Sequence, residues 1–363
     1  MVHRNSVGTV VTLSALVLLA ACTEDTGEEA LPDGCDNCAD VGSDSDVAGD
    51  APGSVQLVLE NWEVAFDATP YGAFMSVWGT SGTDVYTVGG QPFFADEPHG
   101  VVFHFDGDDW RELDIPDGPM LNWVHGAGES VWVVGEGGRA LRFDDGAFVE
   151  EFDTGVDVPL WGVWAAAEDD IWAVGGNALD RTGEPVILHF DGTGWEPVPV
   201  PDLDRDGVLA LFKVWGTRSD HVFAIGMVGA ILHWDGVEWT QVPSGTGADL
   251  VSLWGRADDD IVAVGGRGNG VFGRWDGAAW SFETLDRVSG LNGSFMAPDG
   301  TTVVNGSFGR MLEVTDSGFV DLESPNTNDF HAVWGDPQTG ACFAVGGTLT
   351  GGAPWEGDVL ISR

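Results

Sequence analysis

An internal repeat of about 39 residues constrains the fold of this 363-residue chain more than any other feature. Its clearest copy runs from Val214 to Trp239, and its outline is V-W-G, then D-V-W-A-V-G, then I-L-H-F-D-G-x-x-W. The first aromatic position of the pattern recurs, in each unit, at Trp78, His125, Trp164, Trp215, Trp254, Phe295 and Trp334. The spacings of 47, 39, 51, 39, 41 and 39 residues fit one repeated unit with two insertions.

Each unit holds four short runs rich in β-branched and aromatic residues, separated by glycine, Asp-Gly or Ser/Thr clusters. Four strands in about 40 residues is typical of one blade of a β-propeller, in which such sheets surround a central axis. The 54 glycines fit the tight turns of these blades, and the 17 tryptophans fit the wedges between them. The sequence therefore predicts an all-β, seven-bladed β-propeller over residues 54–363.

The two ends of the repeat region predict how the propeller closes. The seventh unit ends at Val359-Leu360-Ile361, one strand short of a complete blade. At the other end, Trp62-Glu63-Val64 precedes the first complete unit and is similar to the fourth-strand pattern Trp239-Thr240-Gln241-Val242. We expect this N-terminal segment to supply the outer strand of the last blade, because that pairing removes the open edges of the ring.

Residues 1–21 predict an export signal of the bacterial lipoprotein type. A short basic start precedes an apolar run that ends at Ala21 and is too short to span a bilayer. Its last residues, Leu19-Ala20-Ala21-Cys22, resemble the lipobox, whose cysteine becomes the lipid-modified N-terminus of bacterial lipoproteins. The resemblance implies lipidation of Cys22, and Thr23 in place of aspartate implies sorting to the outer membrane of a two-membrane bacterium. The alternative is ordinary secretory cleavage after Ala21.

Residues 22–53 are predicted to form a disordered, acidic tether. The segment after Cys22 has ten acidic residues and no basic residue, so it repels itself and has little to bury. Cys35 and Cys38 lie within it, and a small local disulfide is favoured over a metal clip or a redox motif because no βαβ pattern surrounds them. Cys342 lies in an apolar run and is predicted to be a buried side chain.

The charge balance excludes two classes of partner. The chain has 59 acidic residues against 14 basic ones, a formal net charge of −45. Fourteen basic residues cannot form a basic patch that would bind nucleic-acid phosphates or an anionic membrane surface. The lipid anchor is therefore the only membrane contact that we expect. The hydrophobic content of 43% is nevertheless too high for a disordered acidic chain, and a large folded core is expected.

The turn before the fourth predicted strand resembles the Asp-box of sialidase-type propellers. Its best copy is residues 190–195, and similar turns occur at 106–110, 144–148, 235–239 and 276–280. The aspartate lies four residues before the aromatic residue and is followed directly by glycine, whereas the Asp-box has a distance of five with one residue between. The whole repeat resembles those of bacterial surface lipoprotein propellers and photosystem-assembly-factor-like propellers. This resemblance implies the fold of residues 54–363 and almost nothing about activity.

Two sets of residues could suggest enzymatic or metal chemistry, but for each set a structural packing role is the preferred interpretation. Tyr86 occupies a position where other units have tryptophan or phenylalanine, and the arginines show no motif, so sialidase chemistry is not expected. His104, His189 and His233 share one position in three units. Equivalent positions in a ring do not converge unless they line its axis, so an architectural role is preferred to a zinc site.

An acidic segment resembles the start of a calcium loop. Asp202, Asp204 and Asp206 follow the pattern D-x-D-x-D-G, but Lys213 occupies the twelfth position, where an EF-hand has glutamate. An acidic turn is therefore preferred, with calcium as the alternative and no other cofactor expected.

The positions of the insertions predict which face of the disc binds a ligand. The connection between the second and third strands is long at residues 91–100, 177–185 and 348–356, and the link between units is long at 199–207. In a four-stranded meander these connections emerge on the same face, where binding residues usually lie. The candidate ligand-binding residues there are Phe93, Phe94, His99, Arg181 and Trp355. The alternative is that these aromatic side chains cover the backbone of their own loops.

The sequence favours a non-enzymatic binding or scaffold protein of the cell envelope, which presents one loop-rich face to a protein or glycan partner. The alternative is a carbohydrate-active enzyme, a glycosidase or lyase with carboxylate catalysis in the central depression. No catalytic residue is assigned, because a pair cannot be chosen from 59 carboxylates without geometry.

Overall fold

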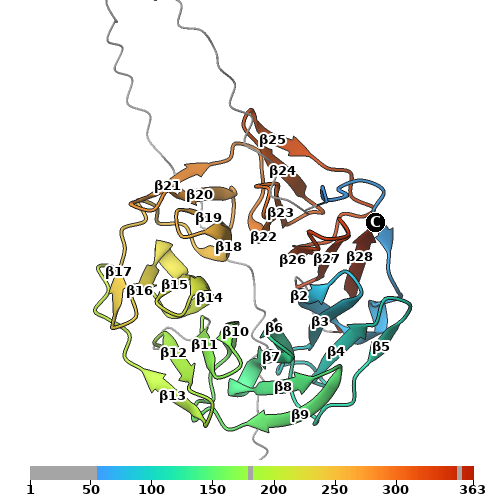
Figure 1. Ribbon diagram of the computed structural model, residues 1–363, viewed down its shortest axis with the longest axis horizontal. Helices are drawn as coiled ribbons and strands as arrows, with labels where there is room; N and C mark the ends of the chain where they lie inside the picture. Colours follow the sequence, from blue (N-terminus) through green and yellow to red (C-terminus); the bar gives the residue numbers. More distant parts are fainter. Residues whose placement is uncertain (1–54, 179–182, 350–353) are drawn as a thin grey trace, which may run out of the picture. The chain divides into compact units, whose positions relative to one another are not determined.

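The computed structural model describes residues 55–178, 183–349 and 354–363 (Figure 1). The predicted signal peptide, the lipidation site Cys22, the tether with Cys35 and Cys38, and the candidate Arg181 lie outside the described residues. Over the described ranges, none of the helices has the length and apolar character needed to cross a bilayer.

The strands form seven four-stranded antiparallel sheets, each a meander. Blade 1 comprises β2 (Ala73–Ser81), β3 (Asp84–Gln91), β4 (His99–Phe105) and β5 (Trp110–Glu112). Blade 2 comprises β6 (Leu121–Ala127), β7 (Ser130–Gly135), β8 (Ala140–Asp144) and β9 (Ala147–Phe152). Blade 3 comprises β10 (Leu160–Ala167), β11 (Asp170–Gly175), β12 (Val186–Phe190) and β13 (Trp195–Val198). Blade 4 comprises β14 (Leu211–Arg218), β15 (His221–Gly226), β16 (Ile231–Trp234) and β17 (Trp239–Gln241).

The remaining blades complete the ring. Blade 5 comprises β18 (Leu250–Ala257), β19 (Asp260–Gly265), β20 (Val271–Trp275) and β21 (Trp280–Thr284). Blade 6 comprises β22 (Leu291–Met296), β23 (Thr302–Gly306), β24 (Met311–Thr315) and β25 (Gly318–Asp321). Blade 7 comprises β26 (Phe330–Gly335), β27 (Cys342–Gly347), β28 (Gly357–Ser362) and β1 (Glu63–Val64). Three short 3-10 helices are η1 (Thr69–Tyr71), η2 (Glu136–Gly138) and η3 (Met227–Gly229).

The predicted all-β propeller with seven blades is confirmed, and so is its closure by the N-terminal segment. Strand β1 pairs antiparallel with β28, with Glu63 opposite Ile361 and Val64 opposite Leu360. The blades succeed one another around the ring in chain order, and the two ends of the propeller meet in blade 7 (Figure 1). The segment before β1 also contributes Leu57 and Trp62, which are buried in the same hydrophobic cluster as Phe343 of β27.

Aromatic side chains fill the wedges between blades, as the tryptophan count predicts. Trp195, at the start of the outer strand of blade 3, packs edge-to-face on Trp132 of blade 2, with ring centroids 5.6 Å apart. Trp239 of blade 4 packs in the same way on Trp172 of blade 3, at 5.2 Å. Trp280 of blade 5 packs in the same way on Phe223 of blade 4, at 5.6 Å. Because the contact runs from one blade to the preceding one, it buries two large rings per wedge and fixes the blade spacing.

The repeated Asp-Gly turn has a local chemical cause. The Oδ1 atom of Asp235 accepts hydrogen bonds from the amides of Val237 and Glu238, at 2.9 and 3.0 Å. These donors hold the pKa of the exposed Asp235 carboxyl below its usual value. Gly236 follows with φ of 92°, and a Cβ there would lie 2.8 Å from the Cβ of Asp220. Asp106, Asp191 and Asp276 accept amide hydrogen bonds in the same way.

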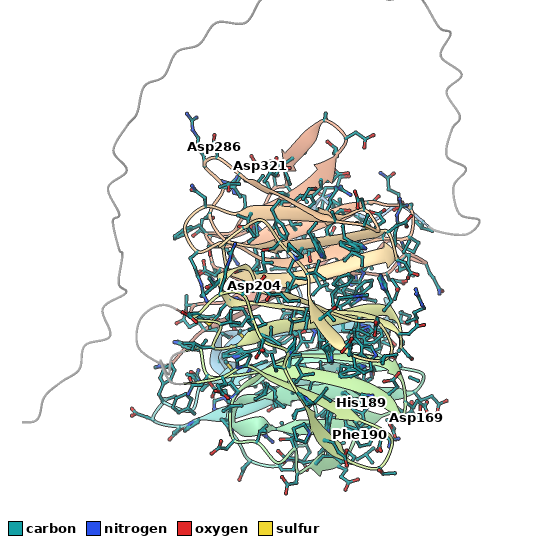
Figure 2. The ribbon with its side chains drawn as sticks, turned by 90° about the vertical axis from the view of Figure 1, so that its left-hand side faces the viewer. Asp169, His189, Phe190, Asp204, Asp286 and Asp321 are labelled. Atoms are coloured by element: carbon teal, nitrogen blue, oxygen red, sulfur yellow. The ribbon has the colours of Figure 1, made fainter. Side chains whose placement is uncertain are left out.

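The meander gives the disc two different faces. We call the face with the second-to-third-strand connections and the links between blades the loop face. We call the opposite face, with the first-to-second and third-to-fourth connections, the turn face. Seen edge-on in Figure 2, Asp204 of the loop face and Asp169 of the turn face lie on opposite sides of the disc. The described ends of the predicted insertions lie on the loop face, because β3, β11, β13 and β27 end there.

Candidate functional site

The axis of the ring is lined by the first strand of each blade, and these strands contain no aspartate or glutamate. They are β2, β6, β10, β14, β18, β22 and β26 (Figure 1). Their repeated aromatic residues form a collar, with Trp78 and His125 5.2 Å apart and Trp254 and Phe295 5.3 Å apart. The His125 ring also lies 6.2 Å from that of Trp254, so blades 2 and 5 touch across the axis. The inner strands therefore offer no carboxyl pair for glycoside hydrolysis.

The single lysine of the chain lies in this collar. Lys213 of β14 is only 3% exposed and places its Nζ over the ring of Trp123 of β6. The blade between them has Gly162 at the equivalent position, where a Cβ would lie 3.0 Å from the Lys213 Cα, so the missing side chain makes the contact possible. Burial lowers the pKa of Lys213 well below its usual value. Burial and the charge of Lys213 together lower the pKa of His125 to about 3.

The three histidines at equivalent third-strand positions each have a partner inside their own blade. His104 Nε2 lies 2.6 Å from Asp84 Oδ1, and His189 Nε2 lies 2.8 Å from Asp170 Oδ1. His233 Nε2 lies 2.8 Å from His221 Nδ1. The hydrogen bond from His104 is the main cause that lowers the pKa of Asp84. These contacts join second and third strands and do not bring the three rings together.

The acidic segment with calcium-loop spacing does not assemble a ligand set. Asp202, Asp204 and Asp206 are exposed, and within the described ranges no group of three His, Cys, Asp or Glu side chains is placed to hold a metal ion. Instead, other contacts tie the segment to blade 4. The amide of Asp204 donates to Gln241 Oε1 at 2.7 Å, and Arg205 Nη1 donates to the carbonyl oxygens of Val228 and Thr246.

The connection from β3 to β4 presents two exposed phenylalanines on the loop face. Phe93 is 59% exposed and Phe94 is 55% exposed, and their rings pack edge-to-face at 5.4 Å. Trp355, also predicted to bind a ligand, is only 7% exposed and supports Phe94 from blade 7 at a centroid distance of 5.4 Å. The predicted ligand residues therefore divide. Phe93 and Phe94 are available to a partner, and Trp355 is buried beside Ala73 and Met120.

Side chains from blades 1 and 2 hold this loop from two sides. The amide of Gln91 donates to the Trp355 carbonyl at 2.8 Å and accepts from the Trp355 N–H at 2.8 Å. On the other side, the Phe93 N–H donates to Glu136 Oε2 at 2.6 Å. Glu136 is 5% exposed, and burial raises the pKa of its carboxyl to about 7 against the opposing effect of this hydrogen bond. The start of the loop, up to the first of its two exposed phenylalanines, is thus fixed to blades 7 and 2.

A second exposed phenylalanine site has an unfavourable backbone. Phe308, in the connection from β23 to β24, is 77% exposed and has φ of 62°. Its amide donates to Asp329 Oδ1 of the next link at 2.9 Å. Val228 in blade 4 repeats this arrangement, with φ of 57° and an amide bonded to Asp249 Oδ1 at 2.9 Å. Glycine is the ordinary residue for this conformation, so the exposed Phe308 and the half-buried Val228 are both held at a cost in backbone strain.

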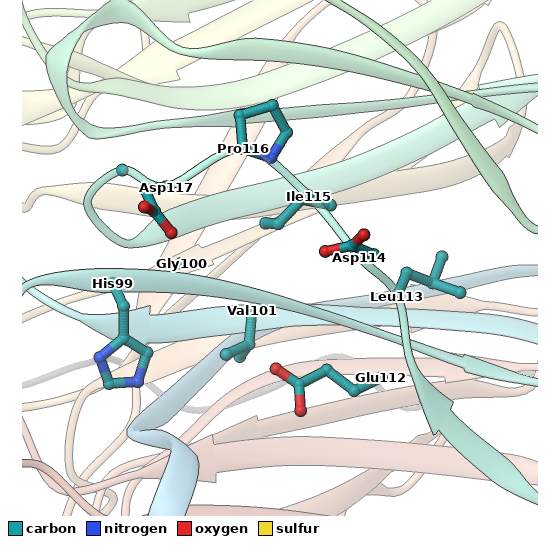
Figure 3. Close-up of a pocket in the computed structure, with 10 residues that line it drawn as sticks. His99, Gly100, Val101, Glu112, Leu113, Asp114, Ile115, Pro116 and Asp117 are labelled. Atoms are coloured by element: carbon teal, nitrogen blue, oxygen red, sulfur yellow. The ribbon is translucent and has the colours of Figure 1, made fainter.

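A hollow of about 430 Å³ borders the phenylalanine loop on the loop face (Figure 3). One wall is the start of β4 at His99, and the other is the link from β5 to β6. The carboxylates of Glu112, Asp114 and Asp117 surround it, and Figure 3 shows them beside the side chains of Val101 and Ile115. We call this hollow the acidic groove. His99 bonds through Nδ1 to the Glu97 carbonyl at 3.0 Å.

Comparison with solved structures shows the same fold at low sequence identity. The WD40 β-propeller domain of Doa1 superposes with a TM-score of 0.62 at 10% identity, covering 83% of this chain and 97% of that one. YCF48 from Cyanidioschyzon merolae gives 0.58 at 15%, with coverage of 83% and 98%. YCF48 bound to D1 peptide gives 0.59 at 15%, with coverage of 85% and 98%. No protein-family model and no curated protein matches the sequence significantly.

Several residues of this surface were not predicted from the sequence. Glu136 and Phe308 lie in short connections between strands. The length of these connections therefore did not mark them as candidate binding loops. Glu112, Asp114 and Asp117 are a few among 59 acids, and only the folded link places them around one hollow. The position of Lys213 had a usable signal, because the equivalent residues of other inner strands are mostly serine, glycine or alanine.

Replacement of Lys213 by methionine should stabilise the protein. The buried amine has no carboxylate partner in the inner strands, and methionine fills similar space without a charge to desolvate. We expect Lys213→Met to raise the free energy of unfolding at pH 7 by about 1–2 kcal/mol. The gain should shrink as the pH rises, because the unfolded lysine then also loses its proton. Lys213→Ala should destabilise the protein, because the shorter side chain leaves a cavity. Urea unfolding of both variants between pH 7 and 10 measures this, and a destabilised methionine variant would contradict it.

Replacement of Glu136 by glutamine should stabilise the protein only at higher pH. The folded carboxyl has a pKa of about 7 against an ordinary 4.5, so wild type loses stability as the pH rises between these values. Glutamine keeps the acceptor for the Phe93 amide and never ionises. We expect the variant to gain about 1–3 kcal/mol at pH 8 and little at pH 5. Denaturant unfolding at both values measures the difference, and an equal effect at both would show that ionisation of Glu136 is not the cause.

Proposed function

We propose that this protein is a binding scaffold of a bacterial cell envelope. In this proposal a lipid on Cys22 anchors the chain at the outer membrane, residues 22–53 act as a tether, and the propeller presents its loop face to a protein partner. The observation that carries the proposal is the Phe93–Phe94 pair, two large apolar rings held in solvent on a loop fixed from blades 2 and 7.

The energetics of such a loop favour binding. Exposed aromatic side chains are the residue type that most often dominates protein interfaces, and a loop that is already ordered loses little entropy when a partner binds. YCF48, in its complex with D1 peptide, is a propeller of this fold that binds a peptide. The ring planes of Phe93 and Phe94 lie at 82°, so they do not make the flat double platform on which a sugar would stack. A protein is therefore preferred to a glycan.

The enzymatic alternative has less support. Glycosidase catalysis in the central depression needs two carboxyl groups about 5–9.5 Å apart at the axis. The seven inner strands contain no aspartate or glutamate, and aromatic rings meet across the axis. The candidate ligand-binding surface is therefore on the loop face of blades 1, 2 and 7, and not in the central depression.

The anchor is tested at its cysteine. In cells supplied with an alkyne fatty acid, wild type should carry the label and sediment with the membrane fraction. Cys22→Ser should lose the label and the membrane association, because a thiol is needed to carry the lipid. Cys342→Ser is the matched control, since Cys342 is 1% exposed, and it should behave as wild type. Equal labelling of the Cys22 variant would overturn the anchor.

The binding surface is tested by cross-linking in cells followed by mass spectrometry. We expect an envelope protein cross-linked to peptides of the loop face, and Phe93→Ser/Phe94→Ser should reduce its recovery by at least about tenfold. The control is Val237→Ser, which removes an 80% exposed side chain from the turn face and should change nothing. Trp355 is left intact, because it supports the loop. Cross-links confined to the turn face, or retained in the double variant, would contradict the proposal.

A further inference from the structure

The acidic groove and the phenylalanine loop form one continuous surface. The loop begins at Gln91, which ends β3, and returns at His99, which begins β4 and forms one wall of the groove. Ile115 supplies partly exposed apolar surface within the groove, and the buried Val101 and Leu113 lie beneath it. A partner segment lying across this surface would therefore meet aromatic rings first and carboxylates next.

The carboxylates of the groove are not used by the fold. Glu112, Asp114 and Asp117 are exposed, and their side chains make no ion pair or hydrogen bond with the described part of the chain. Some acids elsewhere in the propeller do have such a role. Asp235 and Asp276 accept turn amides, and Asp144 and Asp249 pair with arginines. Three unpaired carboxylates around one hollow repel one another and gain from a cation that enters.

The arginine beneath the groove does not pair with the three groove carboxylates. Arg139 lies beneath the β5–β6 link, 6% exposed, and its Nε donates to Glu151 Oε1 at 2.8 Å. Its Nη1 and Nη2 donate to the carbonyl oxygens of Pro119 and Pro116, at 3.1 and 2.8 Å. The guanidinium is thus committed to holding the wall in place. The groove is rigid on this side and keeps its negative charge.

We infer that the acidic groove binds a protein segment in which arginine or lysine lies next to an aromatic or aliphatic residue. This inference rests on the proposed protein-binding function and specifies its partner. The apolar side chain packs on Phe93 and Phe94, and the cationic side chain enters between the carboxylates, where charge-assisted hydrogen bonds are available. A metal ion is the less suitable occupant, because no three of the described carboxylates and histidines converge on one point.

The test is selection from a random dodecapeptide library displayed on phage, with the full-length protein in detergent as target. We expect the selected peptides to share a basic residue beside an apolar one, and their binding, measured by fluorescence polarisation, to weaken as salt is added. Glu112→Gln/Asp114→Asn/Asp117→Asn should weaken the selected peptide by at least about tenfold. The matched control is Glu129→Gln/Asp169→Asn/Asp259→Asn, which removes the same charge from three exposed turns of the turn face and should bind as wild type.

Several other outcomes would overturn the inference. Selected peptides without basic residues, or equal weakening by both triple variants, would exclude a specific role for the groove. Calorimetric calcium binding that is lost in the groove variant alone would make it a metal site instead. If Phe93→Ser/Phe94→Ser abolishes binding while the groove variant does not, the proposed protein-binding function stands and the groove inference fails. The inference stands and the proposed envelope role fails if the peptides bind as expected but cross-linking in cells finds no partner on the loop face.

Discussion

The pairing of β1 with β28 is the contact on which the rest of the propeller depends. Each wedge contact, such as Trp195 on Trp132, joins two neighbouring blades, so it exists only while both blades stay in the ring. The short β1 strand joins the beginning of the repeat region to its end, and the buried Trp62 adds apolar contact there. Without it the outer edge of β28 would be open and blade 7 incomplete.

The closed ring also explains where the charge lies. The inner strands have no acid, and the axis is filled by aromatic rings and one buried lysine, because charged groups there would lose water without gaining partners. Acids occupy turns, links and outer strands. Some, such as Asp235, cap turns and serve the fold directly. The unpaired acids of the loop face give this face a negative electrostatic potential, which repels anions and attracts cationic partners.

The candidate site combines a rigid support with groups that the fold does not need. Phe93 and Phe94 add little to the core, yet Gln91, Glu136 and Trp355 hold their loop in place. Glu136 carries a buried carboxyl with a pKa raised to about 7, and Phe308 adopts a conformation that favours glycine. Both of these features reduce stability, and both lie on the loop face, which is the pattern expected of a surface kept for binding.

The sequence by itself determined the architecture, because a propeller is built from local meanders. The spacing of Trp78 and its equivalents, the missing last strand and the match at Trp62–Val64 were enough to predict the blades and their closure. The site depended on tertiary structure, because its parts come from different blades. Nothing in the sequence distinguishes Glu136 or Asp117 from other acids, or shows that Trp355 is buried while Phe93 is exposed. Those differences arise only when the ring closes and brings blades 7, 1 and 2 side by side.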